Sequence, residues 1–166
     1  MQKAIYNNFL RQYAENRPYE DIATQKALAH FNRLSEEKPY EITDVQEKEN
    51  YKTIQYDAKL DNGETSIKIE VKTDHKSRQT GNCFIEFSQY GKASGFATTE
   101  ADYYVINDTL DYYLISVEDI GEILRVMDAD DELKDISVRT PFGKKMVTKG
   151  WLIKQNRMIS KAVCIT

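Results

Sequence analysis

Apolar side chains recur every three or four positions over two stretches near the start of the chain, residues 1–15 and 19–34. This spacing places them on one face of a helix, so it predicts two amphipathic helices. Pro18 lies between the stretches, and a proline in a helix interior removes a backbone hydrogen bond. We therefore expect the first helix to end near Pro18 and the second to end before Pro39.

After Pro39 the pattern changes to a period of two. Apolar and polar residues alternate over residues 40–45, 53–60 and 66–73, and Asp61-Asn62-Gly63 separates the last two runs. Alternation predicts strands with one buried face, and an Asn-Gly pair between two such runs is typical of a tight hairpin turn. The sequence therefore predicts an antiparallel pair of strands around this turn.

The remainder of the chain mixes short strands with one helix. The expected elements are, in order, strands at 83–88, 102–107 and 112–116, a helix at 117–127, an acidic loop at 128–132, and short C-terminal strands with turns at 141–143 and 149–150. This order predicts a mixed α+β (α/β) fold in which helices flank a central mixed β-sheet. We expect one domain over residues 1–166, with its core at about 19–127 and a C-terminal extension at 134–166.

Composition narrows the class of protein. Hydrophobic residues make up 40% of the chain, which is typical of a folded domain. The two cysteines and two histidines are too few for a disulfide scaffold or a zinc site. No apolar run is long enough to span a membrane, and the N-terminus lacks the apolar segment of a signal peptide. We therefore expect a cytoplasmic protein with no membrane partner.

Charge is distributed unevenly along the chain, whose net charge is −4. Residues 134–166 hold eight Lys or Arg and one acidic residue, a net charge of +7, whereas residues 1–133 carry −11. This basic extension is either a surface that binds phosphate groups or a segment that packs against the acidic part of the same fold. The sequence leaves both readings open.

Candidate chemistry lies on the predicted hairpin. In a strand, residues two apart share a face, so Glu70 and Lys72 point the same way, and Asp57 lies on the polar face of the preceding strand. Two carboxylates suit Mg²⁺, which prefers oxygen ligands and neutralises the charge that builds up when water attacks a phosphodiester. We expect Asp57, Glu70 and the Val71 carbonyl to hold the metal, and Lys72 to orient the water or stabilise the oxyanion.

The alternative for the same residues is a solvated strand face, with an ion pair from Glu70 or Lys72 to Lys59 or Asp57. Such a face would also alternate in charge. It accounts less well for strongly polar residues on a strand whose other face is formed by Ile67, Ile69 and Val71 in our reading. We therefore favour the metal site.

The spacing of Asp57, twelve residues, and then Glu70-Val71-Lys72 resembles the PD-(D/E)XK nuclease superfamily, and the likeness extends over about residues 19–106. The resemblance implies a restriction-endonuclease-like core and a Mg²⁺-dependent endodeoxyribonuclease, with Mn²⁺ as a substitute, of the resolvase-like or phage-encoded kind. It also implies a catalytic glutamate on the preceding helix, for which Glu20 is the best match and Asp21 a rival. Glu86 falls where some members place a further polar residue. Tyr56 stands in place of the proline that many members carry.

A nuclease of this kind needs basic side chains for the phosphate backbone. Our candidates are Lys76, Arg78, Lys92, Lys144, Lys145 and Lys149. DNA is the expected partner, with RNA as the alternative, and cleavage of two strands would favour a homodimer. The competing hypotheses are a non-catalytic nucleic-acid-binding module on the same fold, and a protein-interaction domain that uses the acidic residues 128–135.

Overall fold

The structure is a computed structural model that describes residues 2–36, 38–45, 55–138 and 148–166. The helices of this part are α1 (Gln2–Leu34), α2 (Ser77–Thr80), α3 (Val117–Ala129) and α4 (Gln155–Lys161), with a 3₁₀ turn η1 (Gly95–Ala97). The strands are β1 (Glu41–Val45), β2 (Ala58–Asp61), β3 (Ser66–Thr73), β4 (Asn82–Gln89), β5 (Lys92–Ala93), β6 (Tyr103–Asn107), β7 (Tyr112–Ser116), β8 (Asp135–Val138), β9 (Thr148–Lys154) and β10 (Val163–Cys164).

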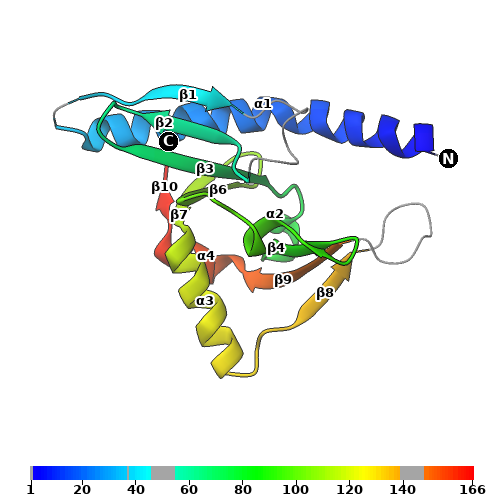
Figure 1. The fold of residues 1–166 in the computed structure, drawn as a ribbon. Helices are drawn as coiled ribbons and strands as arrows, with labels where there is room; N and C mark the ends of the chain where they lie inside the picture. The colour runs from blue at the N-terminus through cyan, green and yellow to red at the C-terminus, as the bar shows by residue number, and fades with distance from the viewer. Residues whose placement is uncertain (1, 37, 46–54, 139–147) are drawn as a thin grey trace.

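The strands form two sheets, a larger one in the order β1-β2-β3-β6-β7-β10 and a smaller one in the order β5-β4-β9-β8 (Figure 1). Within the larger sheet β3 and β6 run parallel and the other neighbours run antiparallel. The predicted mixed α+β class with a central mixed sheet is therefore confirmed. The smaller sheet was not predicted. A parallel pair needs a long crossover, and the crossover from β3 to β6 contains α2, β4, β5 and η1.

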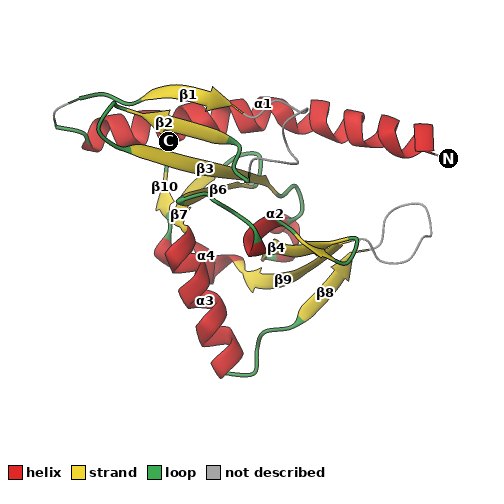
Figure 2. Ribbon diagram, in the orientation of Figure 1, coloured by secondary structure: helices red, strands yellow, loops and turns green. Residues whose placement is uncertain are grey.

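Helix α1 covers one face of the larger sheet (Figure 2). Ala23, Ala27 and Phe31 of the helix pack there with residues such as Leu60 and Ile69 of the sheet. The small alanine side chains, which are fully buried, let the helix backbone approach the strands closely. This packing explains why the alternating apolar residues of β2 and β3 share one face.

The prediction that Pro18 separates two helices is wrong, because α1 continues through Pro18 as one helix of 33 residues. Proline lacks the N–H that would bond the carbonyl four residues earlier, so the helix loses that one bond without ending there. Figure 1 shows the N-terminal part of α1 extending beyond the larger sheet. No helix in the described ranges is long and apolar enough to cross a membrane.

The opposite face of the larger sheet packs against the smaller sheet and against α3 and α4. Tyr104, Ile106 and Ile115 supply this face, and Ile85 and Ile153 of the smaller sheet lie against them. The predicted amphipathic helix at 117–127 is present and extends two residues further, into the acidic run. Its N-terminus is capped by Ser116, whose hydroxyl accepts the Asp119 N–H at 3.0 Å.

The C-terminal region differs from the prediction. Residues 149–150 lie inside β9 rather than in a turn, and residues 155–161 form α4 rather than a strand. Gly150 is needed at its position because a Cβ there would lie 2.4 Å from the Ile85 carbonyl oxygen. The residue type therefore reflects close packing between β9 and β4, not a turn. The predicted turn at 141–143 lies outside the described residues.

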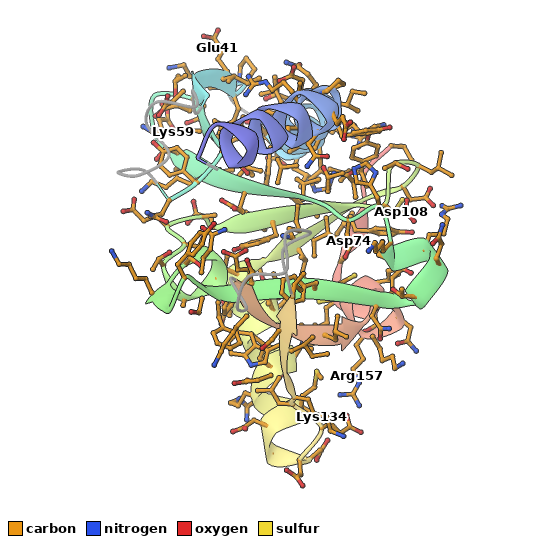
Figure 3. All side chains as sticks on the ribbon, turned by 90° about the vertical axis from the view of Figure 1, so that its right-hand side faces the viewer. Glu41, Lys59, Asp74, Asp108, Lys134 and Arg157 are labelled. Carbon is orange, nitrogen blue, oxygen red and sulfur yellow. The ribbon has the colours of Figure 1, made fainter. Side chains whose placement is uncertain are left out.

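Short polar contacts join the end of β3 to β4. Asp74 accepts the Lys76 N–H at 3.0 Å and the Phe84 N–H at 3.3 Å, and it lies near Asp108 in Figure 3. The segment after β3 forms the one-turn helix α2. Arg78 of this helix binds Asp108 at 3.0 Å, which ties the connection to the end of the β6–β7 hairpin.

Candidate active site

Asp57 lies immediately before β2, beside β3, and not within a strand as predicted. Its N–H donates to the Ile69 carbonyl at 2.8 Å, and its carboxylate accepts the Val71 N–H at 2.6 Å. The side chain therefore takes the place of a main-chain acceptor beyond the start of β2. This contact fixes the carboxylate against the middle of the Glu70-Val71-Lys72 triplet.

The backbone of Val71 faces the same side. In a strand, the N–H and C=O of one residue point toward the same neighbour. Because the Val71 N–H points to Asp57, the Val71 carbonyl opens on the side of Asp57, where β2 does not reach because it begins only at Ala58, opposite Ile69. The geometry is therefore compatible with the predicted contribution of this carbonyl to a metal site.

Glu70 and Lys72 share the face of β3 that is turned away from α1, as the alternation predicts. Burial raises the pKa of the Glu70 carboxyl well above its usual value. The negative charges of Asp57, Glu20 and Glu86 raise this pKa further, and the positive charge of Lys72 opposes them. The other predicted site residues thus lie within electrostatic reach of Glu70, and we call Glu20, Asp57, Glu70 and Glu86 the carboxylate cluster.

Burial also raises the pKa of Asp57, to about 6. The hydrogen bond from Val71 and the positive charges of Lys72 and Arg17 act in the opposite direction and are weaker than the desolvation. A carboxylate that accepts a backbone hydrogen bond would ordinarily have a low pKa. The raised pKa of Asp57 therefore reflects a desolvation that outweighs this hydrogen bond.

The structure distinguishes between the two helix candidates, Glu20 and Asp21. Asp21 is exposed and forms an ion pair with Arg17 at 3.0 Å. Glu20 is half-buried, and burial followed by the charge of Asp57 raises its pKa to about 7. The geometry therefore places Glu20, and not Asp21, in the carboxylate cluster.

Glu86 joins the cluster from β4 of the smaller sheet. Its carboxylate accepts a hydrogen bond from the Ser94 hydroxyl at 2.7 Å. Gly95, whose φ is +53°, packs directly against Glu86, because a Cβ on Gly95 would lie 2.6 Å from the Glu86 carbonyl oxygen. The loop after β4 therefore folds back on Glu86 and limits the directions in which its carboxylate can turn.

Lys72 is a positive charge beside several negative ones. Its ammonium group lies 5.9 Å from the centroid of the Phe84 ring, within range of a cation–π contact. Lys59, the alternative ion-pair partner of Glu70, binds Asp61 at 3.2 Å in the structure. Burial of Glu70 likewise contradicts a solvated strand face.

In the part of the chain that the structure describes, no three His, Cys, Asp or Glu side chains stand together as a complete metal-binding group. Mg²⁺ does not require such a group, because it keeps several waters and takes one or two carboxylates from the protein. The chemistry of the donor set fits a cation, since Asp57 and Glu70 are oxygen donors whose mutual repulsion a positive charge would relieve.

The predicted phosphate-binding residues do not form one group. Lys76, Lys92 and Lys149 are exposed, whereas the guanidinium of Arg78 is engaged by Asp108 and Asp111. Lys144 and Lys145 lie outside the described residues. Lys92 pairs in register with Gln89 and Lys149 with Ser88, so these two lysines flank the same end of β4.

Part of the basic extension packs against acidic residues of the fold. Arg157 binds Glu132 at 2.6 Å, and Lys161 binds Asp119 and Glu122 next to α3. Lys134 is exposed and lies with Arg157 toward the α3 end of the molecule in Figure 3. For Arg157 and Lys161, the second of the two readings of the charge asymmetry is therefore the right one.

Tyr104 is a further residue near the carboxylate cluster that the sequence pattern does not single out. Tyr104 pairs in register with Glu70 on the parallel strands β3 and β6, so both side chains lie on the same face. The neighbouring charges of Glu70, Asp57 and Glu86 add to the burial that raises the pKa of its hydroxyl. Only the pairing of β3 with β6 reveals this position, and a single sequence does not show which strands are neighbours.

Comparison of the chain with family models, with curated protein sequences and with solved structures finds no match.

Proposed function

We propose that this protein is a metal-dependent endodeoxyribonuclease that hydrolyses phosphodiester bonds at Asp57, Glu70 and Lys72. One observation carries the proposal: three carboxylates from separate parts of the chain, those of Glu20, Asp57 and Glu86, act on the Glu70 carboxylate, and the charge of Lys72 opposes them. Burying like charges together is costly unless protons or a cation compensate them. Folding therefore assembles a site whose negative charge requires compensation by protons or a cation.

In this proposal the chain acts as a PD-(D/E)XK nuclease with a restriction-endonuclease-like core. Asp57 and Glu70, with the Val71 carbonyl, would hold Mg²⁺ or Mn²⁺. When bound, the metal supplies neutralisation of phosphate charge and a lowered pKa for water. The position of Asp57 beside the Val71 N–H supports this assignment, because it holds the carboxylate where a second donor from β3 is adjacent.

The protein side chains have separate tasks in this proposal. Lys72, on the same face as Glu70, donates hydrogen bonds to a phosphate oxygen and stabilises the charge that develops on it. Glu20 and Glu86 surround the site with acceptors that orient water. Burial of Glu70 and Asp57 strengthens all these interactions, because charges interact more strongly where water is excluded.

The test is a cleavage assay with Mg²⁺ or Mn²⁺ on linear duplex, branched and single-stranded DNA and on RNA. We expect Glu70→Gln and Lys72→Ala each to lower the rate by at least about a hundredfold, the usual effect of removing one such electrostatic group. Lys68→Ala is the matched control, because Lys68 lies on the same face of β3 but binds Glu100 at 2.9 Å. This control should cleave like the wild-type chain.

Two results would overturn the proposal. One is a wild-type chain that cleaves none of these substrates faster than the Lys72→Ala chain does. The other is a rate that Glu70→Gln leaves unchanged, because activity would then come from elsewhere. If both strands of a duplex are cut, the mass of the active species shows whether two copies act together.

The second candidate function is a nucleic-acid-binding module without catalysis, and the exposed lysines at one end of β4 favour it. Binding through phosphates would weaken with salt, with a log–log slope of roughly −0.9 for each phosphate neutralised on duplex DNA. In this case Lys92→Glu and Lys149→Glu would reduce binding, while Mg²⁺ and Asp57→Asn would leave it unchanged.

A further inference from the structure

The hydroxyl of Tyr104 is a buried polar group without a partner. Tyr104 is 3% exposed, and its hydroxyl is the one buried side-chain polar atom among the described residues that makes no hydrogen bond. Leaving such a group unsatisfied costs on the order of 1–3 kcal/mol. A phenylalanine would avoid this cost and fill the same space, so the hydroxyl calls for an explanation other than packing.

The surroundings of this hydroxyl point to the carboxylate cluster. Tyr104 is opposite Glu70 in the β3–β6 register, and its hydroxyl lies within the electrostatic reach of Glu70, Asp57 and Glu86. The Thr99 hydroxyl is close enough to oppose the rise in the Tyr104 pKa, but it donates its own hydrogen bond to the Gln55 carbonyl at 3.3 Å, and the Tyr104 hydroxyl makes none. A phenol that is kept neutral is a hydrogen-bond donor, and its neighbours are acceptors.

Glu70 is the counterpart of this unused donor. Its side chain is half-buried, its carboxylate is desolvated, and none of the described donors is seen to bond it. A carboxylate that binds a cation with one oxygen needs a donor on the other to fix its direction, and such supporting donors are common around metal sites. Tyr104 is placed to be that donor.

We propose that Tyr104 is a positioning residue for Glu70, whose carboxylate accepts a hydrogen bond from the Tyr104 hydroxyl when it turns to bind a divalent cation. This inference rests on the proposed function, because it needs a cation at the carboxylate cluster. In the absence of the cation the two groups are held side by side without the bond. Cation binding then gains the hydrogen bond that folding left unmade.

The first experiment measures Mn²⁺ binding to the full chain by calorimetry. Tyr104→Phe should bind Mn²⁺ roughly tenfold more weakly, the lower end of the effect of removing a supporting hydrogen bond. Tyr103→Phe is the matched control, because Tyr103 lies on the same strand but packs toward α1, and it should bind as the wild-type chain does. Without metal, Tyr104→Phe should be at least as resistant to urea as the wild type.

The second experiment uses a spectroscopic signal that a purely structural role would not change. Tyrosine labelled with ¹³C at Cζ gives one resonance per residue, and the resonance missing from Tyr104→Phe belongs to Tyr104. Addition of Mg²⁺ should shift this resonance in the wild-type chain and leave it in place in Glu70→Gln. The resonance of Tyr103 should not move in either chain.

The possible outcomes separate the two proposals. If the wild-type chain binds Mn²⁺ and Tyr104→Phe binds it equally well, the role of Tyr104 is refuted while the metal site stands. The same holds if the wild-type chain binds Mn²⁺ but its Tyr104 resonance does not shift when Mg²⁺ is added. If the wild-type chain binds no Mn²⁺, the metal site and the role of Tyr104 fail together. Weaker binding by Tyr104→Phe with a shift that depends on Glu70 supports the inference.

Discussion

Asp57 has two physical roles at the scale of the single residue. Its carboxylate accepts the Val71 N–H at 2.6 Å, and it also contributes negative charge to Glu20 and Glu70. The first role stabilises the fold, because a buried backbone N–H without an acceptor is costly. The second role opposes folding, because it adds to the repulsion among carboxylates. A substitution can separate the two.

We predict that Asp57→Asn is more stable than Asp57→Ala by about 1–3 kcal/mol, the cost of leaving the Val71 N–H unpaired. Both variants remove the charge, but only asparagine keeps an oxygen that can accept the hydrogen bond. Urea unfolding without metal at pH 7.5 measures the difference. Both variants should fail to cleave DNA. Equal stability would show that the Asp57–Val71 hydrogen bond does not hold this part of the sheet together.

At the scale of the element, the point at which β2 begins is what makes the site available. Had β2 begun earlier in the chain, a main-chain acceptor would have covered Val71 where Asp57 now places a carboxylate. The smaller sheet shows a related use of local sequence. Gly150 allows β9 to lie close to β4, the strand that carries Glu86. Strand pairing thus controls the position of one carboxylate on each sheet.

We predict that Gly150→Ala destabilises the protein by about 1–3 kcal/mol, as overpacking does. The new Cβ would lie 2.4 Å from the Ile85 carbonyl and 2.5 Å from the Phe84 ring, so β9 must move away from β4. The control is Gly121→Ala in α3, where a Cβ meets nothing within 4 Å. Alanine should stabilise the helix there by roughly 0.5–1 kcal/mol.

Urea unfolding of both glycine variants gives the comparison. Opposite signs are expected from the same chemical change, because one glycine faces a neighbouring strand and the other faces open space. If Gly150→Ala were as stable as the wild-type chain, close packing of β9 on β4 would not be what requires glycine at this position.

At the scale of the whole molecule, the carboxylate cluster exists only because four segments meet. Glu20 comes from α1, Asp57 from the residue before β2, Glu70 from β3 and Glu86 from β4. The crossover from β3 to β6 places β4 in the smaller sheet, which packs against the face of the larger sheet that carries Glu70, and α1 packs against the opposite face. The charge balance of the cluster is therefore a property of the fold, and it should be visible in the stability of the whole protein.

We predict that stability without metal falls as the pH rises from about 5 to 8. Folding raises the pKa of Glu20 to about 7 and of Asp57 to about 6, whereas both groups titrate near 4 in an unfolded chain. Between these values the folded state binds more protons, so the free energy of unfolding decreases with increasing pH. Mg²⁺ should restore stability at pH 8, because it replaces the lost protons.

The control for this prediction is Glu70→Gln. In this variant the free energy of unfolding should depend less on pH, and Mg²⁺ should no longer stabilise the protein. The comparison with the wild type is needed because His30 acts in the opposite direction, since burial lowers its pKa. Carboxyl groups with a lowered pKa, such as Asp108 and Asp119, titrate below this range and leave the slope unchanged. If the free energy of unfolding of the wild-type chain changed with pH as little as that of Glu70→Gln, the predicted repulsion among the carboxylates would be contradicted.

Local pattern determined much of the secondary structure. The strands at 66–73 and 112–116 have the predicted bounds, because strict alternation and flanking turn residues are local signals. The same alternation placed Glu70 and Lys72 on one face of β3. Pro18 and Gly150 misled the prediction, because the effect of a proline or glycine depends on the packing around it.

Tertiary structure decided what the local pattern could not. The choice of Glu20 over Asp21, the bend of Asp57 toward Val71 and the position of Tyr104 opposite Glu70 all depend on which segments lie side by side. Strand alternation extends over a few residues and is written in the sequence. Burial and pKa depend on groups that are distant along the chain, so the sequence by itself determined the residue types of the site and the fold determined their electrostatic state.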